Sequence, residues 1–419
     1  MDHPEQKTDE SSREGATRSD RLELARYVDA AVSADRLVQP WFSCLQDELG
    51  DVRIFDCHTH LGCADPDGSC FELAEMQAAL AVVDARAVVF PLAEPGSYRA
   101  ANDHILAAAA ASNGQLVPYC RVDPNDKPVI ELERAVAAGA AGIKLHPRAE
   151  RFRLGEPAVK PIFAFANERR LPIIIHAGRG IPSLGQDALE LASRYEHAPI
   201  ILAHAAITDL AWIWRQAAGQ RNLFFDTAWW NIADQLALFS LVPPGQVLFA
   251  SDMPYGRTTA SAALALRAAL AAGLSADQIA VIAGGQLERL LAGDEPLDLG
   301  SAANVPVPGP GLLLERVHTL LVAAAGRLTA GYPAEEYLEL AHLACEVPVG
   351  HPDAAAATSV RELLDRHAAH AATDPPHRGP RAPGTHLIFV AAAVARTPWL
   401  PVPDPRQLTG HTVSTSSEN

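Results

Sequence analysis

The sequence has few basic residues and few cysteines. Lysine and arginine total 34 against 50 aspartate and glutamate residues, which gives a net charge of -16. Because phosphate groups bind to a basic surface, this balance argues against a nucleic-acid partner. The six cysteines form no CxxC pair and are too sparse for a disulfide scaffold, so we expect reduced thiols in a cytoplasmic protein.

Long hydrophobic runs are also missing. Residues 1–20 are charged and lack the apolar centre of a signal peptide, which argues against secretion. The longest apolar stretch late in the chain, 387–394, is too short to span a bilayer, so we expect no membrane partner. With 48% hydrophobic and 20% charged residues, the composition is typical of a globular protein with a sizeable core.

The 419 residues divide into five segments. Residues 1–19 predict a disordered tail, 20–50 a helical extension, 51–293 the main domain, 294–310 a Pro- and Gly-rich linker, and 311–419 a helical region of unknown role. In this last region we predict helices at 312–325, 335–345 and 358–371. Their apolar faces cannot remain in water, so we expect them to pack on the main domain or at the interface of a homodimer.

Short apolar runs alternate with alanine-rich helical stretches in the main domain, a pattern typical of βα units and a parallel sheet. The predicted strands are 52–57, 87–90, 116–121, 142–145, 172–176, 199–204, 222–226 and 246–251. Eight units of this kind predict an α/β fold, a (β/α)8 TIM barrel, whose reactive groups lie where strands end and loops begin.

Ionisable side chains gather at these strand ends. His58 and His60 close the first strand, and alternation along a strand points both imidazoles the same way, so that they can bind one metal ion. With 16 histidines, chance also produces such pairs, and the context must carry the inference. The other strand ends carry Arg121, Lys144 and His146, His176, His204, Asp226 and Asp252.

The order of the strand-end motifs HTH, KLHP, IIIHAG, LAH and SDMP resembles the amidohydrolase superfamily, in particular the branch that contains aminocarboxymuconate-semialdehyde decarboxylase. The resemblance covers about residues 54–291. It implies that His58, His60 and His176 are metal ligands, that Asp252 is the carboxylate ligand and a catalytic residue, and that His204 is an unligated catalytic histidine. Imidazole and carboxylate ligands suit one divalent ion, most simply Zn²⁺.

Lys144 and His146 follow the fourth strand. Related enzymes with two metals carry a carboxylated lysine near this position, but an unmodified ammonium repels a nearby Zn²⁺. We expect one metal, with Lys144 contacting the substrate. His146 has the same strand parity as Lys144 but precedes Pro147, where the strand should turn away.

Three arginines and two tryptophans complete the set of candidate substrate-binding residues. Arg121, Arg148 and Arg179 lie at or just beyond strand ends and could bind a substrate carboxylate, or could pair with local acids. Trp229 and Trp230 follow the seventh strand with Asn231 and could form an aromatic wall, or could pack under a loop.

These features predict an enzyme acting on a small-molecule substrate that carries a carboxylate. The leading function is metal-dependent hydrolysis, with a metal-activated water attacking a lactone, ester or amide carbonyl. The alternative is non-oxidative decarboxylation of an unsaturated or aromatic acid. Decarboxylases of this branch often have Trp after the third histidine ligand, whereas Ala177 and Gly178 stand here. A non-catalytic binding protein on an inherited barrel is the third hypothesis, and the complete ligand set weighs against it.

Overall fold

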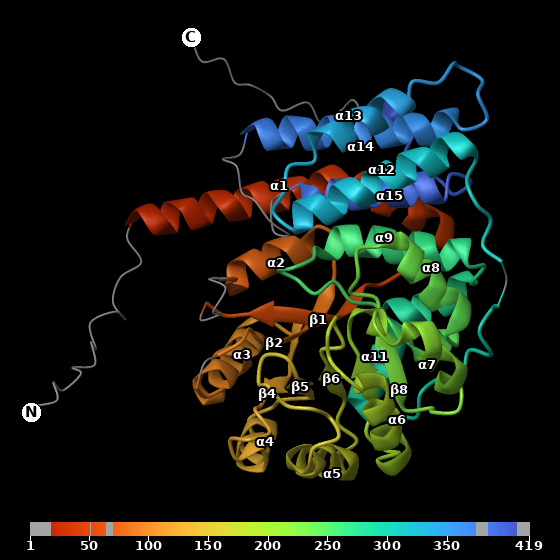
Figure 1. Cartoon of the computed structure of the whole chain (residues 1–419). Helices are drawn as coiled ribbons and strands as arrows, with labels where there is room; N and C mark the ends of the chain where they lie inside the picture. The colour runs from red at the N-terminus through yellow and green to blue at the C-terminus, as the bar shows by residue number, and fades with distance from the viewer. Residues whose placement is uncertain are drawn as a thin grey trace, which may run out of the picture.

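The computed structural model describes residues 18–50, 52–63, 70–94, 96–304, 306–373 and 384–408. The tail predicted for 1–19 lies outside these residues, apart from residues 18 and 19, which begin the first helix. Two layers stack in Figure 1: a βα barrel and, above it, a helical appendage made from both ends of the chain.

All eight predicted strands are present, and every pairing is parallel. The third is divided around Tyr119 into two short strands because its two halves pair with different neighbours. The strands are β1 (Phe55–Leu61), β2 (Arg86–Pro91), β3 (Leu116–Pro118), β4 (Cys120–Arg121), β5 (Ile143–Leu145), β6 (Ile173–Ile175), β7 (Ile200–Leu202), β8 (Leu223–Asp226) and β9 (Val247–Leu248).

The first strand begins and ends later than 52–57. β1 continues through His60 because Thr59 pairs both with Val89 of β2 and, in a parallel bridge, with Met253. The two histidines therefore lie within the strand instead of at its end. A shift in register between Asp56 and Thr59 interrupts the simple alternation of faces that the sequence suggested.

Backbone hydrogen bonds close the strands into a barrel. The order β1-β2-β3 continues through Tyr119 into β4-β5-β6-β7-β8-β9, and the Tyr119 amide donates to the Val89 carbonyl at 2.9 Å. At the other side the Cys57 amide donates to Phe249 O at 3.0 Å and the His60 amide to Met253 O at 2.8 Å. The predicted TIM barrel is therefore the observed fold.

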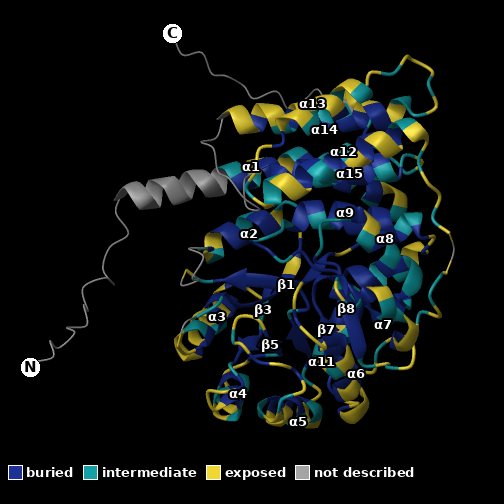
Figure 2. Ribbon diagram, viewed as in Figure 1, coloured by how far each residue is buried: buried dark blue, intermediate teal, exposed yellow. Residues whose placement is uncertain are grey.

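The core has an inner and an outer part, and β6 illustrates both. Ile174 packs inside the barrel against Ile201 and Phe224, whereas Ile173 and Ile175 face the surrounding helices. Because both faces of the parallel strands are covered, the strands are largely apolar, although polar residues such as His58, Lys144 and Asp226 are buried within them. Figure 2 shows the strands mainly in dark blue, whereas the exposed residues, in yellow, lie mostly on the helices and in the loops.

Helices follow the strands around the barrel. They are α2 (Leu73–Ala81), α3 (Arg99–Ala111), α4 (Pro128–Ala137), α5 (Lys160–Arg169), α6 (Leu184–Arg194), α7 (Leu210–Ala217), α8 (Ile232–Leu241), α9 (Thr258–Ala271), α10 (Ala276–Ala280) and α11 (Gln286–Ala292). The appendage contains α1 (Arg18–Leu49), α12 (Leu312–Thr329), α13 (Glu335–Ala344), α14 (Ala354–Thr373), α15 (Thr385–Arg396) and α16 (Pro405–Leu408). Among the described helices, none is both long and apolar enough to cross a membrane.

The appendage contacts the barrel through α1, which packs on α2 and α9, and through α15, which packs on α8 and α9 as well as on α12 and α14. Arg267 of α9 is fully buried and donates to Thr397 Oγ1 at 3.1 Å, Thr397 O at 2.8 Å and Pro401 O at 2.7 Å. Its guanidinium therefore replaces lost solvation with carbonyl and hydroxyl acceptors. The apolar stretch 387–394, for which the sequence indicated no role, is the buried helix at the centre of this layer.

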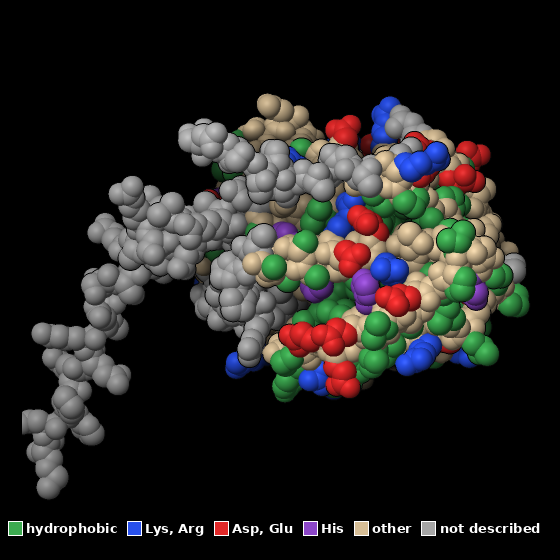
Figure 3. Space-filling model, turned by 90° about the horizontal axis from the view of Figure 1, so that it is seen from above, with side chains coloured by type: hydrophobic (Ala, Val, Ile, Leu, Met, Phe, Trp, Pro, Cys, Tyr) green, Lys and Arg blue, Asp and Glu red, His purple; other side chains and the backbone are tan. Residues whose placement is uncertain are grey.

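The N-terminal helix belongs to the same layer. Trp41 of α1 donates from Nε1 to Ser359 Oγ at 2.7 Å, and Arg366 of α14 donates to Leu37 O at 2.9 Å. Figure 3 shows the outer surface above, where acidic, basic and hydrophobic side chains are intermingled. The segment limits proposed from composition, and the homodimer, stay predictions.

The expectation of reduced thiols is wrong for one pair of cysteines. Cys63 and Cys70 form a disulfide, while Cys44, Cys57, Cys120 and Cys345 are free. The antiparallel bridge between Gly62 and Phe71 brings the two ends of this short loop together, and sequence spacing alone did not reveal that approach. The cytoplasmic location stays a prediction.

Candidate metal and catalytic site

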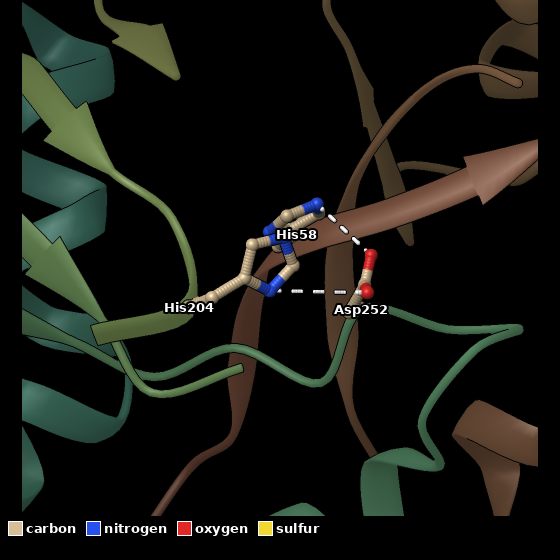
Figure 4. Close-up of side chains that lie close together, drawn as sticks. All are labelled: His58, His204 and Asp252. Carbon is tan, nitrogen blue, oxygen red and sulfur yellow. Dashed lines mark ion pairs between the residues drawn. The ribbon is translucent and has the colours of Figure 1, made fainter. Parts of the chain in front are cut away.

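Histidines from several barrel segments and Asp252 meet at one place in the barrel. In Figure 4 the side chains of His58, His204 and Asp252 point toward one another. Each offers one ligand atom, and these three atoms lie within 4.8 Å of one another. His60 joins the group, with Nε2 at 3.2 Å from Asp252 Oδ1 and 3.3 Å from His58 Nε2.

Hydrogen bonds fix the free nitrogen of the first two histidines. His58 Nδ1 lies 2.8 Å from Asp226 Oδ2, and His60 Nδ1 lies 3.3 Å from the Pro91 carbonyl. Since ionised carboxylates and carbonyls only accept, both Nδ1 atoms donate. The Nε2 atoms then direct lone pairs toward Asp252, which is the arrangement that a shared cation requires.

The same reasoning distinguishes His176 from His204. His204 Nδ1 lies 3.0 Å from the Ala228 carbonyl and must donate, so its Nε2 accepts from His176 Nδ1, also at 3.0 Å. This leaves the lone pair of His176 Nε2, which is buried and has no hydrogen-bond partner. Distance alone groups His204 with the ligands, but its hydrogen bonds leave it no free lone pair, whereas His176 has one.

Two of these residues have an unusual backbone conformation. His204 has a φ of 58° and Asp252 a φ of 61°, both in the left-handed region that non-glycine residues seldom occupy. Such residues cost on the order of 1–3 kcal/mol each and occur mainly where side-chain direction matters. Here the conformation turns both side chains away from their strand ends and into the group.

The carboxylates around His58 favour a positive charge on its imidazole ring. Burial and Lys144 lower the pKa of His58, but Asp252 and Asp226 outweigh them and the pKa is raised overall. Burial opposes ionisation of Asp252, yet His58 and His204 hold its pKa well below the usual range. Burial lowers the pKa of His60 to about 3, so this imidazole is neutral and available as a ligand.

Lys144 lies beside the candidate ligand His58. It is fully buried on β5, and its Nζ lies 3.1 Å from His58 Nε2 and 4.6 Å from the centre of the Phe90 ring. Burial lowers the pKa of Lys144 to about 8, so a fraction of this side chain is the neutral amine near neutral pH. Lys144 is not among the described residues that line the cavity, so its expected contact with substrate stays a prediction.

A cavity of about 760 Å³ opens over the group. His60, His176, His204 and Asp252 lie at its barrel side. The other predicted substrate-binding residues also line it, namely Arg121, His146, Arg148, Arg179, Trp229 and Trp230.

Contacts within the wall decide what each of these residues can offer. His146 stacks on His176 with ring centres 3.9 Å apart, so its side chain packs on a candidate ligand instead of turning away. Arg179 is exposed, with its guanidinium carbon 5.3 Å from the Trp229 ring centre. Arg121 is buried and bonded to Glu150 at 2.7 Å, which supplies the local acid that the sequence left open as an alternative.

Sequence reasoning assigned no role to Asp226, although its strand-end position was noted. Besides His58, it accepts from the His204 amide at 2.7 Å and from the Ala228 amide at 3.0 Å. It therefore orients two histidines that come from different strands. The sequence did not predict that appendage residues such as Phe389 and His386 line the cavity, because only tertiary packing brings them to the barrel.

Several solved structures are distantly similar to part of the chain. No curated protein is significantly similar to the chain in sequence. Among solved structures, 5-carboxyvanillate decarboxylase LigW from Sphingomonas paucimobilis has a TM-score of 0.47 at 16% identity, covering 58% of this chain and 99% of that chain. 4-Oxalomesaconate hydratase LigJ from Rhodopseudomonas palustris has a TM-score of 0.43 at 17% identity, covering 57% and 96%. 2,6-Dihydroxybenzoate decarboxylase from Rhizobium has a TM-score of 0.44 at 12% identity, covering 58% and 99%.

The family assignment comes from the sequence. The amidohydrolase family model matches residues 55–290, which is more than half of the chain and includes every strand of the barrel. Enzymes of this family generally use a divalent metal ion, and the match contains all the candidate ligands described above. The chain therefore belongs to the amidohydrolase family.

Proposed function

We propose that the protein is a metal-dependent hydrolase of a small-molecule lactone, ester or amide. The observation that carries the proposal is the convergence of His58, His60 and Asp252 at 3.1–3.3 Å on the floor of a cavity large enough for a small substrate. The side chain of Asp252 is 19% exposed, so it can reach a molecule in the cavity.

The residues fit one divalent ion. The Nε2 atoms of His58 and His60 lie beside an ionised oxygen of Asp252, and the buried Nε2 of His176, next to Gly178, has no hydrogen-bond partner. This donor set is the one that Zn²⁺ prefers. Such an ion would lower the pKa of a water and polarise a substrate carbonyl.

The chain's own groups would move the protons. Asp252 lines the cavity, with its Oδ2 3.9 Å from His204 Nδ1, and would accept a proton from the attacking water. His204 has both ring nitrogens bonded, to Ala228 O and to His176, so it exchanges a proton only after one of these contacts opens. Asp226 holds His58 and His204 in place throughout.

Hydrolysis is favoured over decarboxylation by the residues after His176. A Cβ at Gly178 would lie 2.4 Å from His176 Nε2, so no larger residue fits there without moving the ring. Decarboxylation of an acid is the second candidate, supported by Arg148 and Arg179, which line the cavity and could bind a carboxylate.

The test combines metal analysis with a substrate screen. The full-length protein should contain about one divalent ion per chain after reconstitution with Zn²⁺, and should hydrolyse a member of a panel of lactones, esters and amides. Carboxylic acids in the same panel test release of CO₂. Metal binding with turnover of acids alone would replace hydrolysis by decarboxylation, and absence of metal binding would overturn both.

A further inference from the structure

The cavity is closed on one side by residues outside the region that the amidohydrolase model matches. Ala31 of α1, Thr329 of α12 and Phe389 of α15 all line it together with Asp252. The barrel therefore supplies the reactive floor of the cavity, while the appendage supplies part of its outer wall.

Phe389 lines this space together with Thr385 and His386 of the same helix, α15. From Thr385 to Ala395 every residue of the helix except Phe389 is buried. Phe389 keeps partial exposure, and its ring stacks on Trp230 with centres 5.3 Å apart and planes at 27°. An aromatic pair that spans the barrel and the appendage thus presents an apolar surface to the cavity.

This wall is held firmly. Besides the contacts of α15 with α8 and α9, a buried ion pair joins Arg257, five residues after Asp252, to Asp35 of α1. His386 of α15 lies with its Nε2 3.6 Å from Asp35. Three separate parts of the chain meet there, so displacing the wall to admit a larger molecule would cost packing free energy.

We propose that the appendage sets the size of the apolar group that the substrate may carry, with Phe389 as the specificity-determining residue. The inference rests on the proposed function only in taking this cavity as the substrate site. Arg148 and Arg179 on the same cavity suit an anionic ligand, so aromatic carboxylates of different size are suitable probes.

The experiment measures the affinity of zinc-loaded, full-length protein for benzoate and 2-naphthoate by calorimetry. Phe389→Ala removes the ring and should raise the naphthoate-to-benzoate affinity ratio by about tenfold, a typical effect of pocket size. Phe389→Trp should lower the ratio by a similar factor. Leu343→Ala, at a side chain 61% exposed on α13, is the matched control and should leave the ratio unchanged.

The outcomes separate this inference from the proposed function. A ratio that changes less than twofold in both Phe389 variants overturns the inference, as does failure of the parent protein to bind either acid. A shifted affinity ratio in a protein that turns over no substrate supports the role of Phe389 and rejects the hydrolase function. Turnover of a substrate with an unchanged affinity ratio supports the hydrolase function and rejects the role of Phe389. Thermal unfolding of each variant checks that the appendage remains folded.

Discussion

Asp226 and His58 form a buried pair at the base of the site, with Asp226 Oδ2 2.8 Å from His58 Nδ1 and neither side chain more than 1% exposed. Burial opposes the negative charge, but His58 and its hydrogen bond lower the pKa of Asp226, so the carboxylate is ionised. The pair decides which nitrogen of His58 is free, and with it whether the neighbouring groups can share an ion.

Asp226→Asn should therefore weaken Zn²⁺ binding by about 10- to 100-fold, because the amide can no longer fix the tautomer of His58. Competition with a chromophoric chelator measures the change. Asp298→Asn, at an exposed position after the barrel, is the control. Equal zinc affinity in both variants would show that Asp226 has no part in orienting the ligand.

Asp252→Asn should lose most turnover, because an amide cannot accept the proton of the attacking water. Rates are to be compared at equal metal occupancy, measured by elemental analysis, since Asp252 is also a proposed ligand. A variant that keeps full activity removes Asp252 from the reaction.

His204→Asn should retain the metal but lose rate by about 10²-fold or more, a typical contribution of general acid-base catalysis. The hydrogen bonds of His204 leave no lone pair for the ion, and this is the reason for expecting retention. Elemental analysis and kcat are both needed. Loss of the metal would instead identify His204 as a ligand.

Protonation of His386 should destabilise the layer between barrel and appendage. Burial, reinforced by Arg257 and opposed by Asp35, lowers its pKa from 6.5 to about 4. The unfolded chain therefore binds more protons between these values, so the contribution of His386 is complete above pH 6.5 and is lost as the pH falls to 4. At about 1.4 kcal/mol per pH unit, it amounts to about 3 kcal/mol.

Urea unfolding at several pH values can detect this contribution. The unfolding free energy of the parent protein minus that of His386→Asn should decrease by about 3 kcal/mol from pH 7 to pH 4. The exposed His104 on α3 gives the matched variant His104→Asn, which controls for the replacement of a histidine by asparagine at the surface. A difference for His386→Asn that does not change with pH would contradict the prediction.

A chain truncated after Leu291 should keep all the proposed ligands but aggregate, because it exposes the apolar faces of α8 and α9 that α15 covers. Light scattering measures the mass. A chain ending at Leu408, which keeps every appendage helix, is the control and should behave like the parent. A truncated barrel that is soluble with the mass of a folded single unit would make the appendage an independent module.

Much of the barrel was predictable from local pattern. Ile173, Ile174 and Ile175 bounded by Pro172 and His176 specify a buried parallel strand whatever surrounds them, and eight such runs alternating with helices suffice for the fold. The same periodicity placed His176, His204 and Asp252 at one end of the barrel, because parallel strands bring their carboxyl ends together.

Tertiary structure alone decided what these residues do to one another. The expected contact of Lys144 with the substrate stays a prediction, and only the fold shows that its Nζ lies 3.1 Å from His58 Nε2. The free nitrogen of each histidine depends on carbonyls such as Pro91 O and Ala228 O, which are distant in sequence and carry no residue-type signal. In the sequence the helix that contains Phe389 was recognisable only as an apolar run. The aromatic partner of Phe389, Trp230, lies 159 positions earlier in the chain. Local periodicity fixes which way a side chain faces, whereas its partner depends on which distant segments fold against it.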